Sequence, residues 1–430
     1  MRKLLPAIII CLLCSLGIHA QDFRTGFFLK NYLYDYRLNP ACHGDSYNGF
    51  VSFGIGDVTV GLQSNFPLAP FIFKDSQGSY TIGLAEGYSM DKLRKRMPNF
   101  GKVNICINEN LASFGWVKRN SAGSFEVNLR SNSSAYIDYE TAKIFMDGLS
   151  GVPYSCENQK VNSRNWLEVA YGFGRSLSSS FSVGARIKGL IGLNYSDFNS
   201  SYLGLDQNHD DIYTFVRDSE GSFRSSNDVL NFKSTDGIIH PVPQLGHYGI
   251  GGIGAAVDLG MKIITDRDLE ISVSILDLGG LLWKNKIYGE LRNMVIGTIP
   301  EVFDLVEAKP EKGSSFVLNP ISVEAGVIYP INDVISAGTL ATIRIDETAR
   351  GWYELRVGGA FSPSRVFSVA ASAGMNTLGA GIGAALNLRL PGIALFIGTD
   401  SLLPLFSLNS DFIPRMKINS AVNAGLSIAW

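Results

Sequence analysis

The amino-acid sequence predicts an all-β fold: a transmembrane antiparallel β-barrel of about 14 strands, with short helices in loops or in the lumen. Three observations lead to this prediction. The N-terminus has the layout of an export signal, several segments alternate apolar and polar residues over unusual lengths, and the chain closes on a strand that ends in Trp430. Alternation alone would also suit a soluble sandwich with one buried face, so strand length, leader and closing residue decide between the two.

The leader comes first along the chain. Arg2 and Lys3 precede an apolar stretch from Leu4 to Gly17, and Ala20 offers a small residue for cleavage before Gln21. This order is that of a secretory signal peptide. The apolar stretch is shorter than the roughly 20 residues that a membrane-spanning helix needs. We therefore predict a signal peptide over residues 1–20, an N-terminal segment over residues 21–46 that leads into the barrel or plugs it, and the barrel itself over residues 47–430.

The longest clean alternation runs from Phe181 to Ser196. Its odd positions are mostly apolar, whereas its even positions include Arg186 and Lys188. A period of two places these two sets on opposite sides of a strand. The stretch is much longer than the roughly 5–6 residues typical of soluble strands, but it suits a tilted spanning strand, which needs about 9–11 residues in the hydrocarbon.

Alternation of this kind marks further strands. We expect fourteen spanning strands, with twelve and sixteen as alternatives: Tyr47–Asn65, Gly101–Lys118, Gly123–Ile137, Ser163–Leu177, Ser180–Asp197, Gly249–Ile264, Leu269–Trp283, Phe316–Tyr329, Val334–Ile345, Trp352–Phe361, Val366–Met375, Gly379–Leu390, Ile393–Thr399 and Lys417–Trp430. Asp211–Arg217 and Ser222–Phe232 are expected to form an extra hairpin around Gly221, in a long extracellular loop or as strand extensions. Met90–Met97 and Tyr139–Leu149 are expected to be short helices, and Gly289–Ala308 a mixture of helix and turns.

The last strand carries Val422, Leu426 and Trp430 on one face and Asn423 and Ser427 on the other. A final strand with a terminal aromatic residue resembles the C-terminal signal that the barrel-assembly machinery reads. A membrane barrel cannot leave a strand edge unpaired in lipid, so this strand is expected to close the barrel.

Composition argues against several other classes of protein. Charged residues are 18% of the chain, and the net charge of −2 leaves no broad basic surface for nucleic acid. Cys42, Cys106 and Cys156 are too few and too widely spaced for a disulfide framework or a zinc site, although one bridge stays open. The G-x-G-x-x-G pattern at 249–254 leads into an alternating strand, whereas a phosphate-binding loop leads into a helix. We expect no cofactor and no metal.

Charged residues on the polar faces of the strands are the candidate functional residues. Either they form a selectivity or ligand-orienting surface, or they fill the interior as a ladder of ion pairs. The candidates for the lumen are Glu126, Arg130, Glu168, Arg175, Arg186, Lys188, Asp277, Glu354 and Arg356. Trp283 and Trp430 are expected at the membrane interfaces, where Trp is favoured.

Short motifs in a fixed order carry a family resemblance. They are Leu38–Ala41, Ser274–Gly279, Trp283–Asn285 and Phe396–Leu403. With them the chain resembles an uncharacterised outer-membrane β-barrel family of the Bacteroidota type, a domain of unknown function. More distantly it is similar to PorV-type barrels of type IX secretion and to long-chain fatty-acid transporters. The resemblance implies a barrel over nearly the whole mature chain. The family has no assigned activity and no catalytic residues that could be carried over to this chain.

Two functions from different classes follow. The apolar segment Phe66–Phe73 favours a channel or transporter for a small or hydrophobic solute, because it suits the lining or plugging of a lumen. The loop-rich stretch Ser200–Gln244 favours a structural or secretion-associated barrel that docks a secreted or surface protein. An enzyme is not expected, since no nucleophile–base pair is legible. The expected location is the outer membrane after cleavage of the leader, among outer-membrane lipid.

Overall fold

In the computed structural model, the described part of the chain forms one β-barrel. It describes residues 23–42, 47–70, 72–74, 80–82, 98–141, 153–207, 214–226, 230–235, 238–243, 249–291, 294–296, 306–345, 352–377, 379–403 and 417–430. The predicted leader and the predicted helix Met90–Met97 lie outside these residues. Among the described residues, no helix is long and apolar enough to cross a membrane.

Strands make up nearly all of the described chain, after two short 3-10 helices. The helices are η1 (Arg24–Phe28) and η2 (Asp35–Arg37). The strands are β1 (Gly49–Phe53), β2 (Val58–Ser64), β3 (Ile72–Lys74), β4 (Tyr80–Ile82), β5 (Phe100–Lys118), β6 (Ser121–Asp138), β7 (Tyr154–Ser176), β8 (Phe181–Gln207), β9 (Thr214–Ser225), β10 (Leu230–Thr235), β11 (Ile238–Pro243), β12 (Gly252–Ile264), β13 (Glu270–Leu291), β14 (Met294–Ile296), β15 (Val306–Leu318), β16 (Ile321–Pro330), β17 (Ile335–Ile345), β18 (Trp352–Phe361), β19 (Phe367–Asn376), β20 (Gly379–Leu390), β21 (Gly392–Thr399) and β22 (Ile418–Ala429).

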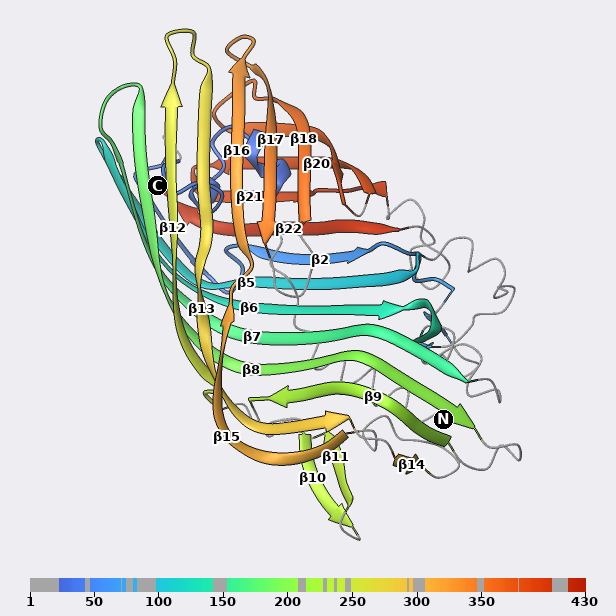
Figure 1. Cartoon of the computed structure of the whole chain (residues 1–430). Coiled ribbons are helices and arrows are strands. Elements are labelled where there is room, and N and C mark those ends of the chain that lie inside the picture. The colour runs from blue at the N-terminus through green and yellow to red at the C-terminus, as the bar shows by residue number, and fades with distance from the viewer. Residues whose placement is uncertain are drawn as a thin grey trace.

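These strands close into an antiparallel barrel of fourteen strands, as predicted (Figure 1). β1 and β2 together form one wall strand, because both pair with β5 on one side and β22 on the other. β15 and β16 form another, since both pair with β13. The last strand β22 therefore meets the first, with Val51 opposite Ile428, and this pairing closes the ring of strands.

Six short turns lie at one end of the barrel. They join β5 to β6, β7 to β8, β12 to β13, β16 to β17, β18 to β19 and β20 to β21. One of them is the two-residue turn Arg119–Asn120, in which Arg119 takes a positive φ of 52° as hairpin turns require. The C-terminus lies at this end too, because Asn48 donates its backbone N–H to the Trp430 carbonyl. We call it the short-turn end; the opposite end carries the longer connections and the two-residue turn between β19 and β20.

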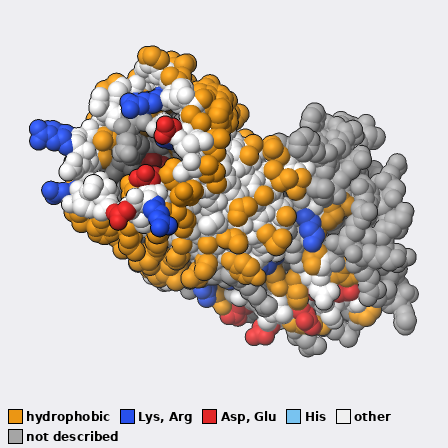
Figure 2. All heavy atoms as spheres, turned by 90° about the horizontal axis from the view of Figure 1, so that it is seen from above, with side chains coloured by type: hydrophobic (Ala, Val, Ile, Leu, Met, Phe, Trp, Pro, Cys, Tyr) orange, Lys and Arg blue, Asp and Glu red, His pale blue; other side chains and the backbone are white. Residues whose placement is uncertain are grey.

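The wall is apolar outside and polar inside. Ile187 is 66% exposed while its neighbour Arg186 is 2% exposed, and Leu355 is 58% exposed while Arg356 is 0% exposed. Figure 2, seen from above the view of Figure 1, shows hydrophobic side chains over much of the outer wall and charged side chains gathered around the hollowed end at the left. This reversal of the usual soluble pattern is that of a transmembrane barrel.

Two predictions about strands were wrong. Gly221 is not the turn of a hairpin: β9 runs straight through it and pairs with β8, with Gly221 opposite Ser200 next to a register shift. Glycine here allows a bulge within a strand and not a reversal. The single strand expected over Phe316–Tyr329 is split into β15 and β16, because Pro320 has no N–H for the ladder.

Two segments expected to be helical are described only in part. Tyr139–Leu149 lies outside the described residues after Thr141. The described parts of Gly289–Ala308 are strand residues of β13, β14 and β15.

The N-terminal segment, residues 23–42, lies inside the ring of strands at the short-turn end (Figure 1). Its aromatic side chains pack into one cluster with wall residues such as Phe50 and Phe396. Inward-facing glycines make room for it. A Cβ on Gly398 would come within 2.2 Å of the Phe23 ring, and one on Gly184 within 2.0 Å of the Pro40 carbonyl oxygen. The wall and the segment are therefore shaped to each other.

Candidate functional site in the lumen

The helix η2 carries two polar side chains onto the inner face of β6. The Arg37 guanidinium donates to Glu126 Oε1 from Nε at 2.8 Å and from Nη2 at 2.6 Å, and the Tyr36 hydroxyl donates to the same oxygen at 2.8 Å. Arg37 Nη1 lies 2.5 Å from Asp57 Oδ2, just before β2. Both carboxylates and the guanidinium are buried, so the segment is joined to two wall strands by charge-assisted bonds.

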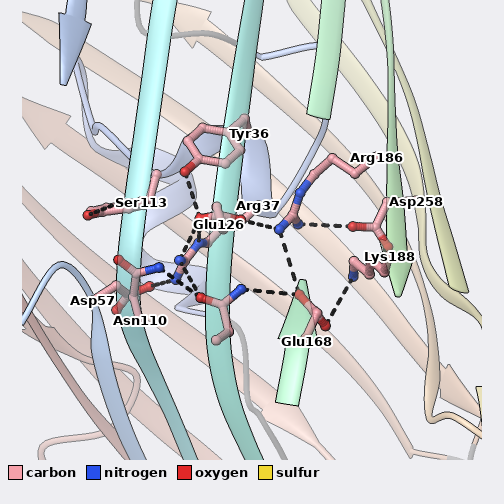
Figure 3. Close-up of polar contacts among 12 residues, drawn as sticks. Tyr36, Arg37, Asp57, Asn110, Ser113, Glu126, Glu168, Arg186, Lys188 and Asp258 are labelled. Carbon is pink, nitrogen blue, oxygen red and sulfur yellow. Dashed lines mark hydrogen bonds and ion pairs between the residues drawn. The ribbon is translucent and has the colours of Figure 1, made fainter. Parts of the chain in front are cut away.

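From Glu126 the contacts continue along the wall (Figure 3). Arg186 on β8 bonds the second oxygen of Glu126 and reaches Asp258 on β12 at 2.9 Å. Lys188, two residues further along β8, lies 2.7 Å from Asp258 Oδ1. Asn128 donates to Glu168 Oε1 at 3.2 Å, which ties β6 to β7.

A β-bulge completes this set of contacts. Asp277 has a φ of 59°, and the register of β13 against β12 shifts at this point. The bulge turns the backbone N–H of Asp277 to Asp258 Oδ1 at 2.7 Å and its carboxylate to Lys188 at 2.5 Å and Arg130 at 2.9 Å. Arg130 also lies 3.0 Å from Glu168. Bulges commonly re-aim a side chain in this way.

We call these nine residues the charged layer. It contains four cations, Arg37, Arg130, Arg186 and Lys188, and five anions, Asp57, Glu126, Glu168, Asp258 and Asp277, which is a net charge of −1. Every cation contacts at least two carboxylates, so the charges neutralise one another across β2, β6, β7, β8, β12 and β13. Such a layer fills the interior and specifies its geometry, and it leaves little uncompensated charge to attract an ionic solute.

A second polar cluster holds the start of the N-terminal segment. Asp400, in the connection after β21, accepts the Thr25 N–H and hydroxyl at 2.7 Å each and the Arg24 N–H at 3.2 Å. Arg24 lies 3.4 Å from Glu354, and Arg356 lies 2.9 Å from the same oxygen. We call these five residues the latch.

The latch keeps the Asp400 carboxylate ionised. Burial raises the pKa of Asp400, but the charges of Arg356 and Arg24 and the donors of Thr25 outweigh it and hold that pKa below its usual value. Arg24 also stacks over the Trp352 ring, with its guanidinium carbon 4.4 Å from the ring centroid. The latch therefore joins η1 to β18 and to the end of β21.

The structure places eight of the nine predicted lumen residues in these two clusters. Glu126, Arg130, Glu168, Arg186, Lys188 and Asp277 lie in the charged layer, and Glu354 and Arg356 in the latch. Sequence reasoning missed Arg37, Asp57 and Asp258 in the layer. Asp258 carried a signal, because it is the one charge on the inward side of β12 between Gly254 and Gly260.

Arg175 does not face the lumen. It is exposed near the end of β7, on the same face as Tyr171 and Phe173, which are 49% and 46% exposed. The alternation of β7 puts odd positions outward, and Glu168, an even position, inward.

Trp283 is not at a membrane interface. It is 0% exposed and stacks on Tyr195, with ring centroids 5.3 Å apart. The bulge at Asp277 shifts the alternation of β13 by one position and turns Trp283 inward, over Gly192. Trp430 is 54% exposed on the outer face against Gly49, and its place at an interface stays a prediction.

No other chemistry stands out in the described part of the chain. Cys42, Cys106 and Cys156 are free thiols. Within the same residues, no group of three or more His, Cys, Asp or Glu side chains has the arrangement of a metal site.

Comparisons with known proteins give one family match and several distant structural matches. The model of a protein family described as "Family of unknown function (DUF5723)" matches residues 40–400. No curated protein matches the chain.

The structural matches include a Pseudomonas aeruginosa FadL homologue (11% identity, 96% of this chain and 99% of that chain, TM-score 0.49). They also include the Ralstonia pickettii toluene transporter TbuX (9%, 92% and 92%, TM-score 0.47) and the Pseudomonas putida toluene transporter TodX (10%, 90% and 91%, TM-score 0.43).

Proposed function

We propose that this chain, which belongs to the DUF5723 family of unknown function, is an outer-membrane transporter for a small solute. In this proposal the N-terminal segment, residues 23–42, is the gate of the lumen. The observation that carries this proposal is how the segment is held. Within residues 23–42 it pairs with no wall strand, and it is fixed by side-chain contacts at the charged layer and the latch. Such contacts break and re-form without unfolding the wall.

The position of the segment supports the same role. It crosses the lumen at the short-turn end, which in outer-membrane barrels faces the periplasm. Of its residues, Lys30 alone is exposed, and its ammonium donates to the Asp333 carbonyl in the turn between β16 and β17. A solute passing through the barrel therefore has to displace the segment.

A reversible lock tests the gate. The Thr25 and Ser372 side-chain oxygens are 3.0 Å apart, so sulfurs at these positions fall within reach of a disulfide. We expect vesicles that contain the wild-type protein to take up a small neutral solute. Oxidised Thr25→Cys/Ser372→Cys protein, in a background without the three native thiols, should lose that uptake and regain it on reduction.

A matched control locks the wall and leaves the segment free. Ser176 and Ser182, on β7 and β8 beside their turn, have hydroxyl oxygens 2.9 Å apart. Oxidised Ser176→Cys/Ser182→Cys protein should transport as the wild type does. Absence of uptake through the wild-type protein for every solute tried, or equal uptake through both oxidised variants, would count against the proposed gate.

A second candidate function is supported by the height of the barrel on one side. β7, β8 and β13 have 23, 27 and 22 residues, whereas the 9–11 residues of a tilted strand are about enough to cross the hydrocarbon. β12 begins at Gly252. Farther from the short-turn end, β9 takes its place between β8 and β13, pairs with both and extends the sheet. This projecting sheet suits the docking of a secreted or surface protein. Photo-crosslinkers at the exposed Asn199 and Glu220 in intact cells should then capture one defined protein.

A further inference from the structure

The outer wall carries an apolar groove where β21 ends. The groove has a volume of about 380 Å³, and its lining includes Ala384, Leu386, Ile397, Gly398, Thr399 and Val422. Its lining is almost wholly apolar. Ile397 and Val422 are 51% and 43% exposed on the outer face, so the groove opens outward, away from the lumen.

Side-chain size along the strand register explains the groove. Ala384 on β20 pairs with Thr399 on β21, and Thr399 pairs with Val422 on β22. The next outward pair is larger, Leu386 with Ile397. Two small residues side by side, ringed by branched ones, leave a depression in the wall. The Thr399 hydroxyl donates to the Ser401 carbonyl at 3.1 Å, so the floor offers no free donor to a polar ligand.

The groove lies within the lipid-facing surface. Thr399 is the last of the eight residues of β21, which begins beside a short turn. At about 3.3 Å per residue and a tilt of about 40°, it stands roughly 15–20 Å from the short-turn end, inside an apolar band that is about 25 Å tall. This is the half of the band that is farther from the periplasm, where the outer leaflet lies.

We propose that this groove is a binding site for an acyl chain of an outer-leaflet membrane lipid. The lining is apolar and without charge, and it is continuous with the lipid-facing wall. An acyl chain fills such a depression, whereas water in it would meet almost no polar partner.

The site bears on the latch. Behind the groove the wall is thin: a Cβ on Gly398 would meet the Phe23 ring at 2.2 Å, and one on Gly383 would meet Thr25 Oγ1 at 2.2 Å. Asp400 follows directly after Thr399. A chain seated in the groove therefore supports the segment of wall that carries the latch, and it stabilises the closed lumen.

Photo-crosslinking tests the site. The full-length mature protein is placed in nanodiscs with a phospholipid that carries a diazirine in the middle of its acyl chain, and labelled peptides are mapped. We expect labels to concentrate on residues 384–402. Ala384→Phe should lower that labelling roughly tenfold, because a phenyl ring fills the floor of the groove. Ala341→Phe, the same change at an exposed position on the outer face of β17, should not lower it.

Two readouts keep the outcomes distinct. Heat-modifiable migration must be equal for both variants, and if Ala384→Phe alone fails this check, Ala384→Leu takes its place. Labels spread evenly around the apolar band, or unchanged labelling in the folded groove variant, would overturn the site. So would mass spectrometry of the purified protein that finds a free apolar compound in the groove and no lipid.

Discussion

The charged layer predicts a large and specific loss of stability on removal of a single charge. Glu126 accepts from Arg37 and Tyr36 on one oxygen and from Arg186 on the other, and it is 0% exposed. Glu126→Gln keeps the shape and removes the charge, which leaves two buried guanidinium groups under-compensated. Breaking a buried pair by removing one partner costs about 3–5 kcal/mol. Arg37 keeps Asp57 and Arg186 keeps Asp258, so we expect the lower part of that range.

Unfolding in denaturant, followed by tryptophan fluorescence in lipid vesicles, measures this loss. The matched control is Glu270→Gln, at a half-exposed pair with Lys262 that is 3.9 Å apart; it should cost about 0–1 kcal/mol. Arg37→Gln should cost less in the Glu126→Gln background than in the wild type, by about 1–3 kcal/mol, because its partner is already gone. Equal losses for the two glutamate variants, or additive losses for Glu126 and Arg37, would show that the Glu126 charge does not stabilise the buried guanidinium groups.

Three further predictions concern the N-terminal segment and the interior. Gly184→Val should expel the segment near Pro40, because its side chain would meet that backbone, and hydrogen exchange of residues 36–42 should rise. Gly189→Val should leave that exchange unchanged, because Gly189 is exposed on the outer face and a Cβ there would meet only the Val169 carbonyl oxygen, at 3.9 Å. Trp283→Ala should lower the free energy of unfolding by about 3–5 kcal/mol, as expected for a fully buried indole. A change under about 1 kcal/mol would mean that the burial and stacking of Trp283 do not stabilise the barrel. Because the pKa of Asp400 is lowered in the folded state, its contribution is complete above the unfolded value of about 3.9 and disappears as the pH falls through the folded value. Exchange protection of residues 23–29 should therefore persist at about pH 5 and fall only below about pH 4, and Asp400→Asn should abolish that acid step.

The wall could be predicted from the sequence because its cause is local. Each strand meets lipid on one face and the polar interior on the other, so apolar and polar residues alternate along the sequence. The predicted strand Trp352–Phe361 has the same bounds as β18, and the strand expected over Gly101–Lys118 differs from β5 by one residue. Closure by the last strand also followed, because an unpaired edge is costly in lipid.

Departures from strict alternation could not be predicted. The bulge at Asp277 adds one residue to β13, so that Leu276 and Trp283 both face inward although their positions differ in parity. Nothing in the composition of this strand announces the shift. The wrong prediction for Arg175 has another cause. Strict alternation from Phe173 places Arg175 on the outer face, so the expectation of a lumen position did not follow the pattern of the strand.

The contacts between side chains inside the lumen could not be predicted, because the residues that meet are far apart along the chain. Thr25 and Asp400 are 375 residues apart, and Arg37 and Glu126 are 89 residues apart. Single-sequence periodicity indicates which side of a strand a residue faces, and it does not indicate which residue lies opposite. The segment 21–46 was expected to lead into the barrel or plug it, but its own helices and anchoring side chains carry no periodic signal.

Ion conductance across a planar bilayer tests most directly whether residues 23–42 close the lumen. The full mature protein should hold a low resting conductance, and deletion of these residues should open a steady, large conductance in a barrel that still shows heat-modifiable migration. If the wild-type protein conducts steadily as an open pore, or if a folded deletion variant stays sealed, residues 23–42 do not close the lumen.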